Sequence, residues 1–96
     1  MDMEIQKLQE LQRSIADSIF IRVESWNLYL GDAGLAEALA IECIANLEKG
    51  ATIASQKALT AVKVKLGGGG FEVPLIKLVS PGQIFDLEKI LESYYG

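Results

Sequence analysis

The chain has 96 residues, a net charge of −4 and a 50% hydrophobic composition, which suits one domain with a single modest core. It has no histidine and one cysteine, Cys43, which excludes histidine-ligated metal sites, histidine general bases and an intramolecular disulfide. The acidic balance counts against nucleic acid as the main partner, because phosphate binding needs clustered lysine and arginine.

The first expected element is a long amphipathic helix over about residues 4–30. Its apolar positions recur every three or four residues, and they are Ile5, Leu8, Leu11, Ile15, Ile19, Val23, Trp26 and Leu30. The run from Ile19 to Val23 is rich in β-branched residues and also fits a strand. The unbroken stripe favours a helix there, and Phe20 and Ile21 then widen its apolar side toward a buried or dimeric interface.

The second and third helices are expected over about residues 33–49 and 53–61. Gly31 can end the first helix and Asp32 can cap the second. Cys43 lies in the apolar stripe of the second helix, so we interpret it as a small buried hydrophobe and not as a nucleophile. Gly50 ends that helix.

Residues 62–75 change from helical spacing to the alternation of a β-hairpin, with a run of four glycines at its centre. If residues 67–70 form the loop, Leu66 pairs with Phe71 and Lys65 lies opposite Glu72, which is a favourable cross-strand pair. Pro74 then lies on an edge strand. The glycines do not form a P-loop, because Phe71 and Glu72 follow them where lysine and serine or threonine are needed.

The last helix has a clear start signal and is expected over residues 81–95. Ser80 is the predicted N-cap, Pro81 occupies the first helical position, and Gln83 completes a capping box. The predicted fold is therefore α+β and mostly helical. Three helices are followed by a glycine-turned two-stranded antiparallel hairpin and a C-terminal helix, in a single domain over residues 1–96.

No acid–base pair, nucleophile pair or cofactor motif stands out, so we assign no catalytic, cofactor-binding or metal-binding residues. We favour a non-enzymatic interaction or accessory protein whose partner is another protein or a second copy of the chain. The candidate interaction surface consists of Ile19, Phe20, Ile21, Trp26, Asn27, Tyr29, Asp32, Gly67, Gly68, Gly69 and Gly70. An alternative interpretation gives the segment from Trp26 to Asp32 a structural role, with Trp26 in the core and Asp32 as a helix cap.

A rival interpretation is a winged-helix nucleic-acid-binding protein, in which the third helix reads the major groove and the hairpin is the wing. The third helix offers Lys57, and the wing offers Lys63 and Lys65, which are few cations for phosphate contacts. Nucleic acid is therefore not the favoured partner. A small enzyme that uses carboxylates or lysine is a third alternative, which the sequence does not locate.

Two motifs resemble a small cyanobacterial family of unknown function. The first joins residues 17–21, DSIFI, to residues 25–33, SWNLYLGDA; the second joins residues 64–69, VKLGGG, to residues 73–75, VPL. The glycine run here is four long, where the family pattern leads us to expect three and then a polar residue. The resemblance covers residues 15–95 and implies a photosynthetic bacterial cell with peripheral contact at the thylakoid membrane. It transfers no catalytic residues.

The location expected from the residues themselves is the cytoplasm. The acidic N-terminal stretch lacks the pattern of a signal peptide, and no apolar run approaches the length of a membrane span.

Overall fold

The computed structural model describes residues 2–23, 26–66 and 71–95. In chain order the elements are α1 (Asp2–Ser18), β1 (Phe20–Val23), β2 (Trp26–Tyr29), α2 (Leu30–Ala33), α3 (Ala36–Asn46), the 3₁₀ turn η1 (Leu47–Lys49), α4 (Ala51–Ala61), β3 (Lys63–Leu66), β4 (Phe71–Pro74), the 3₁₀ turn η2 (Leu75–Lys77) and α5 (Pro81–Tyr95). The fold is α+β and mostly helical, as the sequence predicts.

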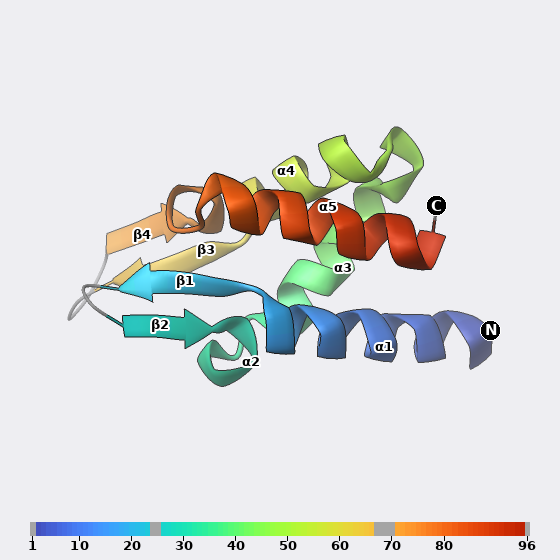
Figure 1. Cartoon of the computed structure of the whole chain (residues 1–96), viewed down its shortest axis with the longest axis horizontal. Helices are drawn as coiled ribbons and strands as arrows, with labels where there is room; N and C mark the ends of the chain where they lie inside the picture. The colour runs from blue at the N-terminus through green and yellow to red at the C-terminus, as the bar shows by residue number, and fades with distance from the viewer. Residues whose placement is uncertain (1, 24–25, 67–70, 96) are drawn as a thin grey trace.

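The longer helices enclose the core. Helix α1 packs against α3 and α5, and α4 packs against the same two helices, so that these helices close a ring (Figure 1). The β1–β2 and β3–β4 hairpins both extend from one end of this ring, opposite the chain termini (Figure 1). The molecule is accordingly elongated, with extents of 40 × 24 × 22 Å.

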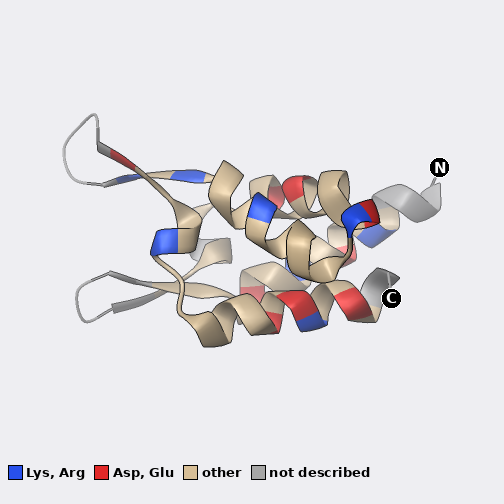
Figure 2. Ribbon diagram, turned by 90° about the horizontal axis from the view of Figure 1, so that it is seen from above, with Lys and Arg blue, Asp and Glu red and all other residues tan. Residues whose placement is uncertain are grey.

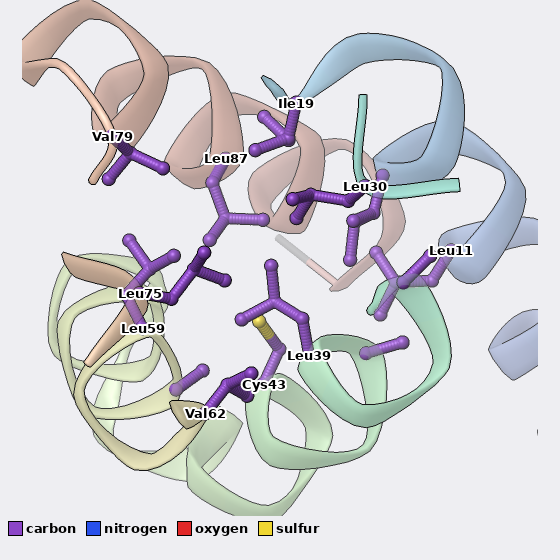
Figure 3. Close-up of a cluster of buried hydrophobic side chains, with 14 of the residues drawn as sticks. Leu11, Ile19, Leu30, Leu39, Cys43, Leu59, Val62, Leu75, Val79 and Leu87 are labelled. Atoms are coloured by element: carbon purple, nitrogen blue, oxygen red, sulfur yellow. The ribbon is translucent and has the colours of Figure 1, made fainter. Parts of the chain in front are cut away.

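Leucine and isoleucine side chains from each helix of the ring fill its middle, where Ile19 and Leu30 join them (Figure 3). The fully buried helical members include Leu11, Ile15, Leu39, Cys43, Leu59, Leu87 and Leu91. Burying one such leucine or isoleucine contributes about 1.5–3 kcal/mol. The hairpins lack a comparable interior of their own and depend on this cluster, because a two-stranded hairpin is marginal alone.

The helix predicted over residues 4–30 is wrong beyond Ser18, where a β-hairpin replaces it. The amide of Ile19 donates the last helical hydrogen bond to the Ile15 carbonyl at 3.0 Å, and the Ile19 carbonyl accepts from the Leu30 amide at 2.9 Å. The β-branched run after Ser18 prefers extended backbone, and tertiary burial supports that preference. Ile19 and Ile21 both enter the core, as alternate residues of a strand do.

The region between the first hairpin and α4 also differs from expectation. Gly31 and Asp32 neither end α1 nor cap α3, because both lie within the short helix α2. That helix ends at Gly34, whose φ of 74° is left-handed, and α3 then begins without a side-chain cap. Gly50, with φ of 100°, separates η1 from α4 and so confirms the predicted helix stop.

The second hairpin has the predicted register. Leu66 pairs with Phe71 and Lys65 with Glu72, and the amide of Leu75 donates to the Val62 carbonyl at 2.8 Å. Because hydrogen-bonded and non-hydrogen-bonded pairs alternate in an antiparallel ladder, Pro74 falls at a non-hydrogen-bonded site and costs no ladder bond. The glycine loop predicted over residues 67–70 lies outside the described residues.

The last helix begins as predicted, but its glutamine has a different partner. The Ser80 hydroxyl accepts a hydrogen bond from the Gln83 amide at 3.2 Å, which confirms the N-cap. The Gln83 side chain is buried, and its Oε1 accepts from the backbone amide of Phe20 at 2.7 Å. Its Nε2 donates to Oδ2 of Asp86 at 3.1 Å. Gln83 therefore fastens the start of α5 to the outer edge of β1.

We expect Gln83→Ala to lower the free energy of unfolding by about 1–3 kcal/mol, because the Phe20 amide loses its acceptor in a partly buried place. Urea denaturation followed by circular dichroism measures the change. Gln56→Ala, at an exposed position of α4, is the matched control and should stay within about 0.5 kcal/mol of the parent. Equal effects of the two substitutions would contradict a structural role for the Gln83 amide.

We expect Gly31→Ala to destabilise the fold by about 1–3 kcal/mol, because there is no room for a methyl group between α2 and α1. A Cβ at Gly31 would lie 2.8 Å from Cβ of Ala16 and 3.2 Å from its carbonyl oxygen. Gly82→Ala is the control, since the nearest atom to its Cβ is the Ser80 hydroxyl at 3.8 Å. In the first turn of α5 it should be neutral or raise stability by up to about 1 kcal/mol. Urea denaturation of both variants measures the difference in their free energies of unfolding. A Gly31→Ala protein as stable as the parent would contradict the requirement for glycine at this contact between α2 and α1.

Candidate functional site

Two residues of the predicted interaction surface belong to the core. Ile19 is 0% exposed and Ile21 is 1% exposed, so neither can form an interaction surface in the folded chain. This corrects the prediction that they are part of an interaction surface on an apolar helix. The chain's own core covers Ile19 and Ile21, so these two residues do not need a second copy to bury them.

Phe20 and Tyr29 are the predicted surface residues that the structure brings together. They are cross-strand partners in the β1–β2 hairpin, with ring centroids 5.2 Å apart and ring planes at 54°. Such an aromatic pair stabilises its arrangement by about 0.5–1.5 kcal/mol beyond burial. Tyr29 is 39% exposed and Phe20 is half-buried. We call this pair the hairpin patch.

The remaining predicted surface residues stay predictions. The backbones of Trp26 and Asn27 lie in β2 and that of Asp32 in α2, but their side chains are outside the described part of the molecule. Gly67, Gly68, Gly69 and Gly70 are outside it altogether.

A second surface feature, which sequence analysis missed, is a furrow between α3 and the α4–β3 segment. It consists of two adjoining hollows of about 630 and 420 Å³, which share Glu42, Ala61 and Lys63. We call it the α3–α4 furrow, and its lining comprises Leu35, Ala38, Ile41, Glu42, Asn46, Gln56, Lys57, Thr60, Ala61, Val62 and Lys63. The sequence feature that could have predicted this furrow lies in α3, where apolar residues occupy the outer side of the helix as well as the core-facing side.

The two walls of the furrow differ in charge. Helix α3 carries Glu37 and Glu42 and no basic residue, whereas α4 and β3 carry Lys57, Lys63 and Lys65 and no acidic residue. Figure 2 shows the lysines of the β3–β4 hairpin at the opposite end of the molecule from the termini. The Lys63 ammonium donates to the Thr60 carbonyl at 2.9 Å, which holds the lysine at the end of α4.

Cys43 has the structural role that the sequence predicts. Its side chain is fully buried, and Figure 3 shows its sulfur among the core leucines. Burial raises the pKa of the Cys43 thiol to about 12, and the negative charge of Glu42 adds to the increase. A buried thiol that stays protonated is a poor nucleophile and a poor metal ligand.

We expect the Cys43 thiol of the native protein to react with a maleimide or a disulfide reagent at pH 8 roughly a thousandfold more slowly than that of the urea-unfolded protein. The pKa change from 9.0 to about 12 lowers the thiolate fraction by that factor. The same shift predicts that stability is retained below pH 9 and falls above it, as the unfolded thiol ionises and the native one does not. Labelling of the native thiol at the unfolded rate would contradict this.

Within residues 2–23, 26–66 and 71–95, no group of three cysteine, aspartate or glutamate residues is placed to hold a metal ion. In the same described segments, no helix combines the length and the apolar character needed to cross a bilayer.

Comparison with known proteins identifies the family. Residues 8–94 match the family described as "Protein of unknown function (DUF3181)". The chain is also 31% identical over 90 residues to "Thylakoid-associated protein slr0729" of Synechocystis sp. (strain ATCC 27184 / PCC 6803 / Kazusa), which covers 92% of this chain and 89% of that protein. No solved structure matches the chain. These matches confirm the resemblance that the two sequence motifs carried, and the chain belongs to the DUF3181 family.

Proposed function

We propose that this protein is a non-enzymatic accessory factor of a photosynthetic bacterium, which binds a protein partner at the thylakoid membrane through the hairpin patch. The observation that carries the proposal is the partly exposed aromatic pair of Phe20 and Tyr29 at the base of the β1–β2 hairpin. Aromatic side chains are enriched among the residues that dominate binding energy at protein interfaces.

The hairpin patch is held in place before any partner arrives. The Phe20 amide is bonded to Gln83, and the ring of Phe20 packs against that of Tyr29. Ordering flexible side chains is one of the costs of association, so a prearranged pair loses less free energy on binding.

The membrane assignment is supported by the relative from Synechocystis, which is named as thylakoid-associated. The choice of a protein partner over lipid rests on charge. The chain carries a net charge of −4, and an anionic lipid surface attracts clusters of lysine and arginine. Binding through an aromatic pair to a membrane-bound protein does not need such a cluster.

The winged-helix alternative has weaker support. The order of α3, α4 and the β3–β4 hairpin suits it, but α4 carries one charged residue, Lys57. With Lys63 and Lys65, Lys57 gives the helix and the hairpin three lysines, which are few for contacts to phosphates.

The test compares three kinds of membrane preparation in a sedimentation assay with the purified full chain. These are washed cyanobacterial thylakoids, the same thylakoids after removal of exposed protein by protease, and protein-free vesicles made from the extracted thylakoid lipids. We expect retention on the intact thylakoids and its loss on the other two. The Phe20→Ala/Tyr29→Ala double variant should lower retention by about tenfold or more, as expected for loss of an aromatic anchor.

Phe85→Ala is the matched control, because Phe85 is 55% exposed on α5 and lies outside the hairpin patch. It should bind thylakoids as the parent does, and both variants should keep the parental circular dichroism spectrum. Equal retention on protein-free vesicles would replace the protein partner with lipid. Retention that is unchanged in the double variant would refute the role of the hairpin patch, and a turnover activity lost with one carboxylate would refute the non-enzymatic function.

A further inference from the structure

Helix α3 is apolar on more sides than the folded chain covers. Its inner side supplies Leu39 and Cys43 to the core, while Ala38, Ile41 and Ala45 lie exposed on its outer side. Ile41 is 47% exposed at the edge of the 420 Å³ hollow. A run of exposed apolar residues along one side of a helix marks a candidate contact surface.

The charges around this uncovered side have a self-complementary pattern. One wall of the α3–α4 furrow is acidic through Glu42, and the other is basic through Lys57 and Lys63. Glu42 on the α3 wall and Lys63 on the opposite wall each line both hollows, so both lie in the part that the two hollows share. Neither Glu42 nor Lys57 forms an ion pair within the described part of the chain, so both charges are available to a partner.

A two-fold axis that runs parallel to the furrow converts this pattern into matched contacts. Rotation about such an axis exchanges the two walls, so the acidic wall of one copy meets the basic wall of the other. Glu42 of each copy then lies over the partner's basic wall, which carries Lys63. The exposed Ile41 side chain lies over the same wall, where Ala61 and Val62 line the partner's smaller hollow. A perpendicular axis would instead set like charges against each other, which is unfavourable.

We infer that the protein forms a symmetric dimer with a second copy of itself through the α3–α4 furrow. The occupant is a second copy because the furrow carries both halves of the charge pattern that it would recognise. This surface is separate from the hairpin patch, so the inference does not depend on the proposed function.

The test is sedimentation equilibrium of the full chain over a concentration series at low salt, with Glu42→Lys, Lys63→Glu and an equimolar mixture of the two. Each single substitution creates two like-charge contacts in a dimer of identical chains. We expect each single substitution to raise the dissociation constant by about tenfold or more, because loss of a close charge pair at an interface has an effect of this size.

In the mixture, a heterodimer places the introduced lysine against the introduced glutamate and the native Lys63 against the native Glu42. Affinity should return to within about threefold of the parent, which a contact within one chain could not achieve.

Ile41→Gln and Ile53→Gln form the second, uncharged comparison. The two isoleucines are similarly exposed, at 47% and 44%, but Ile53 does not line the furrow. Ile41→Gln should weaken the dimer by about tenfold and Ile53→Gln should leave it unchanged. The Phe20→Ala/Tyr29→Ala variant should dimerise as the parent does, which separates this result from the thylakoid assay.

A parent protein that stays monomeric throughout the concentration series would overturn the inference. So would a dimer that is unaffected by Lys63→Glu and Ile41→Gln, because another surface would then hold it. A mixture of the charge variants without recovered affinity would overturn the wall-to-wall arrangement.

Discussion

The structure depends on burial of one apolar cluster between α1, α3, α4 and α5. Each strand pair is too small to exclude water from both of its faces, and two-stranded sheets are marginal alone. The hairpins therefore exist because residues at their helix-proximal ends reach this cluster. Ile19 and Ile21 do so for the first hairpin, and Val62 and Leu75 for the second. The hairpin patch is the strand pair next to α1 and α2, and it lies on the face of the first hairpin opposite Ile19 and Ile21. That face remains available for other contacts.

The sequence predicts the second hairpin and α5 well because their signals are local. Alternation around Pro74 defines one register, and Ser80 with Pro81 defines one helix start. The first hairpin was missed because steps of four and of two both fit the residues that reach the core. Ile15 to Ile19 is a helical step, whereas Ile19 to Ile21 is a strand step, and Ile19 belongs to both patterns. The choice is made by pairing with Leu30, a contact that periodicity along the chain does not contain.

The candidate site was predicted in part for the same reason. Phe20 and Tyr29 were identified as surface residues, but on a helix they would not have been cross-strand neighbours. Once Ile19 and Ile21 are assigned to a strand, alternation alone places Phe20 on the opposite face from them. The α3–α4 furrow was missed because it needs the packing of two helices and the direction of β3. The hydrogen bond from the Phe20 amide to Gln83 was not predicted either, because the sequence pattern assigned the Gln83 side chain to a capping box within α5.

The hydrogen bond from Phe20 to Gln83 has a consequence for the order of folding during synthesis. The two residues are separated by 63 positions in the sequence. When β1 leaves the ribosome, its outer edge has no acceptor, and none can be supplied until the start of α5 has also emerged. Because translation proceeds at about 5–20 residues per second, the Phe20 amide of the nascent chain lacks this acceptor for several seconds. An unpaired edge amide can bond to a strand of another chain, so this position of the newly made protein is open to such contacts in that interval.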